Sequence, residues 1–329
     1  MLAPRPFGPT GRSVSPIGFG AWAIGGTWGK VTEADAVAAL TAALDGGVDF
    51  IDTADVYGDG RSERIIAQVL ATRSGARPFV ATKAGRRISP HLAENYTRAT
   101  LEAHIDRSRA NLQMDCLDLV QLHCPPAPAY DSARVFDAMQ AIKETGKIAN
   151  FGVSVERIDE AQKAIEYPGV VSVQIIYNLF RQRPADAFFA EAAARHVAVI
   201  VRVPLASGLL TGKMSANSTF AADDHRSFNR NGEAFDKGET FSGVPYDVAL
   251  AAVEELRPLV PQGTTMAAFA LRWILMEQAV SVVIPGSKSP AQSLGNAAAL
   301  TLPPLPAETM AAAKEIYALR IAPHVHQSW

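Results

Sequence analysis

Four side chains that can transfer or stabilise a proton follow predicted strands of this chain. Asp52 and Tyr57 belong to the string DTADVYGDGRSE over residues 52–63, which begins where a short apolar run ends. Lys83 ends the run FVATK, and His123 ends the run LDLVQLH. The carboxyl ends of parallel strands share one face of an α/β fold, and active sites form there. We therefore expect these four side chains to lie together.

Their chemistry suits the reduction of a carbonyl group, in which a proton donor must meet the developing alkoxide. An unperturbed tyrosine has a pKa of about 10, and an ammonium about 4 Å away stabilises the phenolate by on the order of 4 kcal/mol at an effective dielectric constant of about 20. Lys83 could therefore bring the pKa of Tyr57 to about 7, since one pKa unit corresponds to about 1.4 kcal/mol. Asp52 would keep Lys83 charged, and His123 would orient the carbonyl.

Each of these residues also has a purely structural interpretation. Asp52 could be a helix cap or turn residue, and Tyr57 an amphipathic residue at a rim. Lys83 could be a solvated strand end, and His123 a core histidine with satisfied hydrogen bonds. Four reactive types at the same end of consecutive strands are hard to obtain from packing alone, so the combination favours an active site.

Strand-length apolar runs alternate with segments of helical period along the chain. Most of the runs are apolar on both alternating faces, which is typical of parallel strands covered on both sides. Helices are expected to begin at caps such as Thr32 and Ser289. Eight strands with interleaved helices in 329 residues favour an α/β fold of the (β/α)8 TIM barrel type, formed by residues 1–329 as a single domain. The expected strands span residues 17–20, 49–52, 79–83, 117–123, 150–154, 171–176, 198–203 and 281–284.

Two segments go beyond a minimal barrel. Residues 4–15 are predicted to form a hairpin that turns at Thr10-Gly11 and closes the bottom of the barrel. Residues 214–244 are polar, dotted with glycine and weakly periodic, and they are longer than an ordinary connection. We expect them to form a lid over the catalytic face. The tail should carry one more amphipathic helix at residues 307–319.

The bulk composition points to a small-molecule ligand. The chain has 31 basic and 33 acidic side chains and a formal net charge of −2. This balance argues against nucleic acid or an anionic membrane as the main partner. The N-terminal segment is broken by proline and lacks the apolar core of a signal peptide, and no apolar run reaches the roughly 18 residues of a membrane span. We therefore expect a cytoplasmic protein.

The cysteines and the histidines of the tail indicate neither a disulfide nor a metal site. Cys116 and Cys124 flank one expected strand and would lie roughly 25 Å apart along it, too far for a disulfide. Reduced thiols suit the cytoplasm. His324 and His326 have no carboxylate or cysteine cluster near them in the sequence, so no metal is expected. The sequence does not indicate the oligomeric state.

The string DTADVYGDGRSE and the four side chains closely resemble the loop after the second strand and the catalytic tetrad of the aldo-keto reductases. Similar strings continue along the chain. They are IGFGAW at 17–22, GVS at 152–154, VQ at 173–174, PLASGLLTGK at 204–213 and IPGSKSPAQ at 284–292. The resemblance implies an oxidoreductase that transfers a hydride between a nicotinamide cofactor and an aldehyde, ketone or sugar carbonyl. Tyr57 would be its general acid.

A nicotinamide cofactor would have to be held without the glycine-rich Rossmann fingerprint or a phosphate loop, since neither motif is present. The resemblance implies that Ser154 and Gln174 bind the carboxamide, the loop after the seventh strand cradles the pyrophosphate, and residues 286–296 hold the adenosine end. Trp22, Trp28, Tyr57 and His123 would contact the substrate. The residues expected to bind the cofactor are Gly20, Ala21, Trp22, Asp52, Ser154, Gln174, Arg202, Pro204, Leu205, Ser207, Gly208, Leu210, Gly286, Ser287, Lys288, Gln292 and Asn296.

The preferred cofactor is expected to be NADPH, with NAD as the second candidate. Lys288 lies beside a predicted helix N-terminus, where a phosphate is favoured. Gly286 and Gln292 stand where some family members place a cation, and Arg202 stands where an aromatic ring commonly stacks on the nicotinamide. Lys288 is thus the main candidate for a 2′-phosphate contact, although Ser289-Pro290 could simply cap the helix.

Two other functions agree with the same residues. Some proteins of this superfamily resemble reductases but serve as cofactor-sensing regulatory subunits of ion channels. A barrel lyase could instead use Lys83 as a Schiff-base nucleophile. An intact tetrad favours turnover over regulation, and a tyrosine beside the lysine favours proton transfer over Schiff-base chemistry.

Overall fold

The computed structural model describes residues 2–26 and 28–329, in which eight strands form one curled parallel sheet in sequence order. The sheet closes where its two edge strands meet, through parallel bridges that pair Ile17 with Val283 and Gly20 with Gly286. The predicted (β/α)8 barrel is therefore confirmed. The strands are β3 (Phe19–Gly20), β4 (Phe50–Asp52), β5 (Phe79–Ala84), β6 (Leu119–His123), β7 (Phe151–Ser154), β8 (Val170–Ile176), β9 (Ala198–Arg202) and β10 (Val280–Val283).

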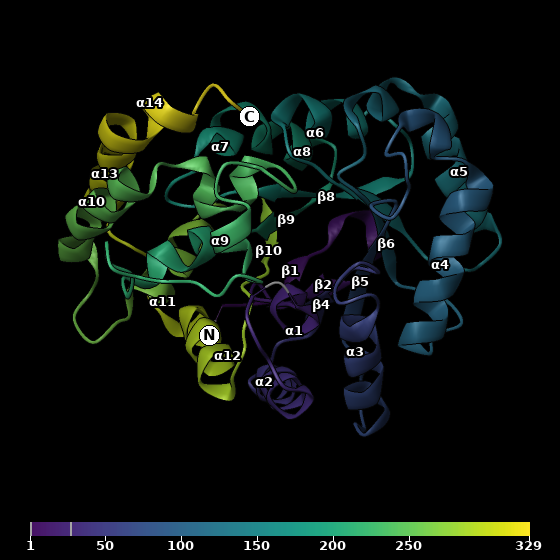
Figure 1. The fold of residues 1–329 in the computed structure, drawn as a ribbon, viewed down its shortest axis with the longest axis horizontal. Coiled ribbons are helices and arrows are strands. Elements are labelled where there is room, and N and C mark those ends of the chain that lie inside the picture. Colours follow the sequence, from purple (N-terminus) through teal and green to yellow (C-terminus); the bar gives the residue numbers. More distant parts are fainter. Residues whose placement is uncertain (1, 27) are drawn as a thin grey trace.

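Helices connect the strands and surround them (Figure 1). Side-chain caps begin two of the helices as expected: Thr32 accepts a hydrogen bond from the Asp35 amide, and Ser289 accepts one from the Gln292 amide. The helices between strands are α1 (Trp22–Gly25), α2 (Glu33–Asp45), α3 (Arg61–Ala71), α4 (Arg98–Leu112), α5 (Ala133–Glu144), α6 (Ile158–Ala164), α7 (Arg183–Ala187), α8 (Phe189–Ala194), α9 (His225–Phe228), α10 (Tyr246–Leu256) and α11 (Met266–Leu275). After β10 come α12 (Pro290–Ala297), α13 (Ala307–Ile316) and α14 (Ala322–Val325).

The observed boundaries differ from the predicted ones by one or two residues, for identifiable reasons. Ile17 and Leu117 form only isolated bridges, so the first and fourth barrel strands begin two residues late. β9 ends at Arg202 because Val203 has a φ of 52°, which a strand cannot accommodate. The tail helix α13 passes into a π turn at Tyr317–Ile321 instead of continuing as an α-helix to residue 319.

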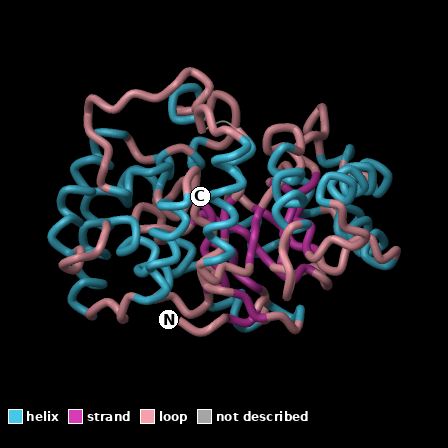
Figure 2. Tube along the Cα trace, turned by 90° about the horizontal axis from the view of Figure 1, so that it is seen from below, coloured by secondary structure: helices cyan, strands magenta, loops and turns pink. Residues whose placement is uncertain are grey.

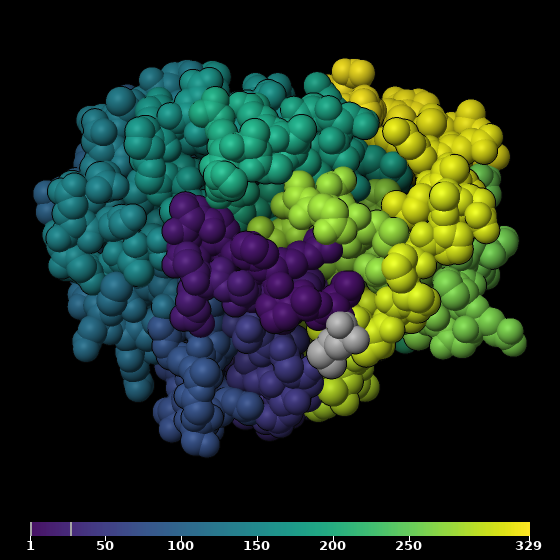
Figure 3. Space-filling view, turned by 180° about the vertical axis from the view of Figure 1, so that it is seen from behind, coloured from purple at the N-terminus to yellow at the C-terminus, as the bar shows by residue number. Residues whose placement is uncertain are grey.

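The N-terminal hairpin closes the bottom of the barrel, as predicted. Its strands β1 (Arg5–Pro6) and β2 (Ser13–Val14) pair antiparallel around a turn in which Gly11 has a φ of 71°. Between them Phe7 is fully buried inside the barrel, with its ring centroid 5.2 Å from that of Phe50 and 5.0 Å from that of Phe79. The hairpin lies across the middle of the back face in Figure 3.

The segment 214–244 connects β9 to α10 on the opposite side, where Figure 2 shows long loops on the side away from the N-terminal end. We call this segment the lid. His225, on its short helix α9, lies 4.8 Å from Trp22 and 4.5 Å from Trp28 between ring centroids. The lid therefore packs on the residues that follow β3, at the carboxyl end of the barrel, where it was expected.

Two further expectations can be compared with the structure. Both cysteines are free thiols, with Cys124 buried and Cys116 exposed. Among the described residues, no helix combines the length and the apolar character that crossing a membrane would require.

Truncating the hairpin's anchor tests the role of the hairpin in closing the barrel. We expect Phe7→Ala to lower the free energy of unfolding by about 3 to 5 kcal/mol, because a buried aromatic ring is replaced by a cavity. Leu319→Ala is the control, since Leu319 is 69% exposed and should change stability by less than about 0.5 kcal/mol. Urea unfolding followed by circular dichroism measures both values. Similar small losses of unfolding free energy in the two variants would contradict a stabilising role for Phe7.

Candidate active site

The structure brings the four predicted side chains together at the carboxyl end of the barrel. The Lys83 ammonium donates to Asp52 Oδ1 at 2.5 Å, to the Thr53 carbonyl oxygen at 2.8 Å and to Tyr57 Oη at 3.3 Å. The His123 ring stands edge-on to the Tyr57 ring, with centroids 6.0 Å apart. An acid, an ammonium, a phenol and an imidazole thus share one corner of the site.

The position of Tyr57 depends on a close approach between two loops. Gly58 has a φ of 60°, and a side chain there would overlap the Gly25 carbonyl oxygen. A side chain on Gly25 would come within 2.6 Å of the Tyr57 Cβ atom. The Arg61 guanidinium then fastens the two segments, donating to the carbonyl oxygens of Ile24 at 2.6 Å and Val31 at 2.8 Å. The loop that carries the phenol is therefore held rigidly against the segment that follows β3.

The Asp52 carboxylate is held by two amides as well as by Lys83. Its Oδ2 atom accepts from Gln121 Nε2 at 3.0 Å and from Gln174 Nε2 at 2.7 Å. Gln174 Nε2 also donates to Gln121 Oε1 at 3.1 Å. The amide hydrogens of Gln174 are therefore used within the protein, and its carbonyl oxygen is the atom it can offer to a ligand.

The expectation that Lys83 brings the pKa of Tyr57 to about 7 is wrong for this structure. Burial raises the pKa of Tyr57 to about 12, because it outweighs the opposing Lys83 charge, and Asp52 and Glu239 raise it further. Much of the field of Lys83 is cancelled by the carboxylate that it binds. Tyr57 is consequently protonated at neutral pH, in the form that can donate.

His123 is neutral in this environment. Burial lowers its pKa well below the ordinary value, and the neighbouring cations Lys83, Arg86 and Arg202 lower it further. Its Nδ1 atom is buried and has no hydrogen-bond partner among the described residues. A neutral imidazole with one N–H is suited to orient a carbonyl oxygen without competing as an acid.

A cavity of about 570 Å³ extends from this corner to the N-terminus of α12. Its volume lies within the usual range for a small-molecule or cofactor site. Most of the predicted site residues line it. They are Gly20, Trp22, Trp28, Asp52, Tyr57, His123, Ser154, Gln174, Arg202, Pro204, Leu205, Ser207, Gly208, Gly286, Lys288, Gln292 and Asn296.

Four predicted residues do not line the cavity. Lys83 is buried behind Asp52 and Tyr57 and acts through them. Ala21 and Leu210 are fully buried in the core, and Ser287 is buried with its hydroxyl oxygen accepting from Asn296 Nδ2 at 3.0 Å. Ser287 therefore orients a residue that lines the cavity.

Several cavity residues were missed because they lie in the aperiodic lid and the turn before it. Arg226 and Glu239 bring charge to the cavity wall, and Met214 brings an apolar surface. Arg202 Nη1 lies 3.3 Å from Glu239 Oε1, and Arg202 Nη2 donates to the Val155 carbonyl oxygen at 2.8 Å. The only signal in the sequence was the presence of charged residues within the predicted lid, which does not tell which of them point inward.

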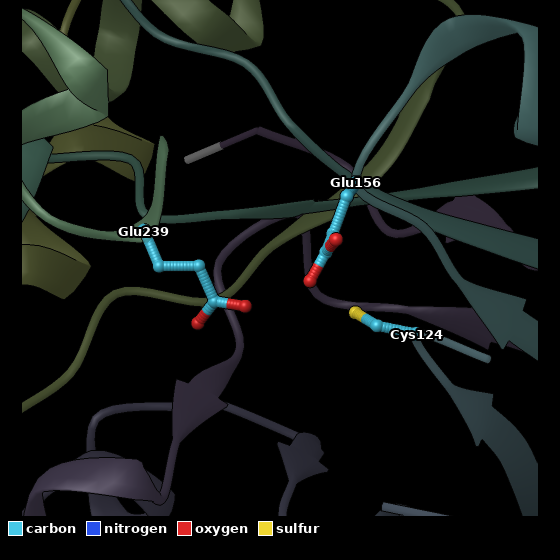
Figure 4. Close-up of side chains that lie close together, drawn as sticks. All are labelled: Cys124, Glu156 and Glu239. Carbon is cyan, nitrogen blue, oxygen red and sulfur yellow. The ribbon is translucent and has the colours of Figure 1, made fainter. Parts of the chain in front are cut away.

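Cys124, Glu156 and Glu239 converge beside this arginine, as Figure 4 shows, with one ligand atom from each within 4.8 Å of the others. The Arg202 guanidinium already lies against the group, 3.3 Å from Glu239 and 4.0 Å from the Cys124 sulfur. Burial raises the pKa of the Cys124 thiol to about 11 and that of the Glu156 carboxyl to about 7. A thiol that keeps its proton and a cation already in place make this cluster an ion-pair network rather than a metal centre.

Lys288 reaches across the mouth of the cavity. Its ammonium donates to the Trp28 carbonyl oxygen, and its backbone amide donates to Gln292 Oε1 at 2.7 Å. The guanidinium carbon of Arg226 lies 5.0 Å from the centroid of the Trp28 ring. Burial, and then the charge of Arg226, lower the pKa of Lys288. Two cations therefore face this end of the cavity.

Asp55 is a buried carboxyl group in the loop that carries Tyr57. Both of its oxygens are buried and have no hydrogen-bond partner among the described residues. Burial, and then the charge of Glu63, raise its pKa from 3.8 to about 7. Since the unfolded chain loses this proton near pH 4, the folded state carries a penalty that grows between about pH 4 and pH 7.

Removing this carboxyl should shift the pH dependence of stability. We compare the unfolding free energy of Asp55→Asn with that of the parent protein at pH 5 and at pH 8. On going from pH 5 to pH 8 the difference should grow in favour of Asp55→Asn by about 2 to 3 kcal/mol, because the amide cannot ionise. Urea unfolding at both pH values measures the change. Asp115→Asn, at an exposed side chain, is the control and should show no such drift. A parallel pH dependence in Asp55→Asn and the parent would mean that Asp55 ionises freely in the folded state.

Comparison with known proteins places this chain in a family. The aldo-keto reductase YhdN of Bacillus subtilis (strain 168) is 32% identical over 289 residues, covering 86% of this chain and 84% of YhdN. A probable voltage-gated potassium channel subunit beta of Oryza sativa subsp. japonica is 29% identical over 316 residues, 91% of each chain. The structure of the glycerol dehydrogenase of Gluconobacter oxydans covers 100% of this chain and 98% of its own, with a TM-score of 0.79 and 29% identity.

The model of the Aldo/keto reductase family matches residues 16–318. The match runs from the turn before β3 into the π turn after α13, so it includes every barrel strand and the lid. Sequence, barrel and the corner around Lys83 agree, and this chain belongs to the aldo-keto reductase family of NAD(P)-dependent oxidoreductases.

Proposed function

We propose that this enzyme reduces an aldehyde, ketone or sugar carbonyl with NADPH as the preferred cofactor and Tyr57 as the general acid. One observation carries the proposal: the Lys83 ammonium bridges the Asp52 carboxylate and the Tyr57 hydroxyl, at 2.5 and 3.3 Å, directly behind the cavity wall that these two residues line. A protonated phenol beside a fixed ammonium supplies a proton and then stabilises the phenolate that is left.

The residues divide the work as follows. The bound nicotinamide supplies the hydride. Tyr57 Oη donates its proton to the oxygen that becomes the alcohol, and Lys83 stabilises the resulting phenolate. Asp52 keeps Lys83 charged: burial lowers the pKa of that lysine, but Asp52 and Tyr57 outweigh burial and leave it above its ordinary value. Neutral His123 orients the carbonyl through its N–H group.

The cavity suits an extended dinucleotide. Its inner end has the Ser154 hydroxyl and the Gln174 carbonyl oxygen as candidate carboxamide partners, and its outer end lies at the N-terminus of α12, which favours a phosphate. Within the described part of the chain, the Lys288 ammonium donates to no carboxylate and contacts only the carbonyl oxygen and the ring of Trp28, whereas Arg226 is already held by both oxygens of Asp224. Lys288 is therefore the cation that is freer to exchange its partner for a 2′-phosphate, which supports NADPH over NADH.

The remaining parts of the proposal concern location and the other functions considered. Two free thiols support a cytoplasmic location. The likeness to a potassium channel subunit favours a regulatory role as the second candidate, and slow turnover with tight cofactor retention would support it. Lys83 is buried and donates to three acceptors, so a Schiff-base role is not part of the proposal.

Substitutions at the acid test its assignment. We expect Tyr57→Phe and Lys83→Met each to lower kcat for carbonyl reduction by about 100-fold or more, the usual range for a lost general acid. Cofactor affinity should stay within a few fold, because neither substitution removes a cofactor contact. Steady-state kinetics with a panel of carbonyls and calorimetric cofactor titration measure the two effects. Tyr167→Phe, whose hydroxyl donates to the Tyr130 carbonyl oxygen outside the cavity, is the control. Near-normal turnover in Tyr57→Phe would refute the assignment.

Cofactor choice is tested separately at Lys288. We expect Lys288→Ala to weaken NADPH binding by about 1 to 3 kcal/mol, the range for a hydrogen bond to a charged group, and to leave NADH binding nearly unchanged. Binding of both cofactors is measured by calorimetry at two salt concentrations, since a partly exposed phosphate contact weakens with salt. Exposed Lys314→Ala is the matched control. An unchanged ratio of NADPH to NADH affinity would assign the discrimination to other residues.

A further inference from the structure

Trp329 packs against the part of the lid that faces the cavity. In Figure 1 the tail runs from α14 to its end beside α7, where Arg183 Nη1 donates to the Trp329 carbonyl oxygen at 2.5 Å. The indole Nε1 donates to both carboxylate oxygens of Asp236, at 3.0 and 3.1 Å. The six-membered edge of the ring lies on Gly243, where a Cβ atom would come within 2.5 Å of it.

The other face of the indole covers a buried arginine. The Arg181 guanidinium carbon lies 3.7 Å from the ring centroid, and the side chain is nearly fully buried. Its Nε and Nη1 atoms have no hydrogen-bond partner among the described residues. The aromatic face and the nearby Asp236 carboxylate are therefore the main groups that compensate this charge. Trp329 is thus held by the Asp236 carboxylate at its indole nitrogen and by the Arg181 guanidinium on its ring.

The same lid turn carries a cavity residue. Asp236 caps the 3-10 turn Lys237–Glu239, accepting from the Gly238 amide at 2.7 Å. Glu239 follows Asp236 by three residues in the same turn. Its carboxylate lies 3.3 Å from the Arg202 guanidinium in the cavity wall. The turn therefore has the tail on one side and the cavity on the other.

We propose that Trp329 is a positioning residue that fixes the 236–243 part of the lid and thereby holds Glu239 against Arg202. Trp329 is not in the cavity lining, so it acts on the substrate only through this turn. The kinetic consequence of this proposal rests on the reductase function proposed above. Its structural consequence for the lid does not.

The kinetic consequence concerns the charge of the substrate. Arg202 is buried, and Glu239 is its salt-bridge partner. When the turn is released, Glu239 withdraws and leaves the Arg202 guanidinium at the cavity wall without its salt-bridge partner, so that the more distant Glu156 compensates its charge only in part. The cavity then attracts anions, so α-keto acids should become better substrates relative to neutral aldehydes of similar size.

The first experiment measures the lid without using activity. Hydrogen–deuterium exchange at residues 236–243 is compared in the parent enzyme, Trp329→Ala, Trp329→Phe and the control Gln327→Ala, whose side chain is exposed. We expect exchange to rise by about tenfold in Trp329→Ala, to rise less in Trp329→Phe, which keeps the ring over Arg181, and to stay unchanged in Gln327→Ala. Unchanged exchange in Trp329→Ala would overturn the proposal.

The second experiment measures selectivity in the same proteins and in Glu239→Gln. We expect Trp329→Ala to shift the ratio of KM for a neutral aldehyde to KM for an α-keto acid by about threefold to tenfold, in the same direction as Glu239→Gln. The double variant should shift it no further than Glu239→Gln alone, because both changes act on one salt bridge. Additive shifts would overturn the proposal. A parent enzyme without carbonyl reduction would contradict the proposed function instead, and exchange alone would then decide the role of Trp329.

Discussion

The Lys83 ammonium is buried in the barrel wall with three oxygen atoms around it, and the geometry of the catalytic corner follows from keeping that charge stable. An unpaired buried ammonium would be strongly unfavourable, and the Asp52 side chain beside it, at 2.5 Å, is its ion-pair partner. Asp52 in turn needs its second oxygen satisfied, and Gln121 and Gln174 supply the donors. The third contact of Lys83 is Tyr57 Oη. The hydroxyl of the proposed proton donor, Tyr57, is thereby placed by the same requirement that stabilises the ion pair.

In the proposed mechanism, a fixed ammonium allows Tyr57 to act as the acid although its side chain is partly buried. Burial dominates in this environment and raises the pKa of Tyr57 to about 12. Once the proton moves to the substrate oxygen, however, the phenolate is 3.3 Å from a cation that was already in position. The stabilisation is therefore available when negative charge develops, without rearrangement of the site, which is the condition for electrostatic catalysis.

Around Arg202 the charges come from segments that are far apart in the sequence. Arg202 comes from β9, Glu239 from the lid and Glu156 from the end of β7, and each cation there has a carboxylate neighbour. Because the lid supplies one of these partners, its position sets the charge that a substrate meets. The tail residue Trp329 and the buried Arg181 then connect the electrostatics of the cavity to packing on the outer side of the lid.

The features that sequence determined are local ones. The eight strands, the caps at Thr32 and Ser289, the hairpin and the existence of the lid could be predicted because apolar periodicity, capping chemistry and turn residues act within a few positions. The four residues of the catalytic corner could be predicted to lie together because parallel strands end at one face. Tertiary structure alone decided the pKa of Tyr57, since burial is not readable from a string of residues. It also decided that Glu239 meets Arg202 and that Trp329 meets Asp236 and Arg181, because these contacts join aperiodic segments whose approach is set by the closed barrel.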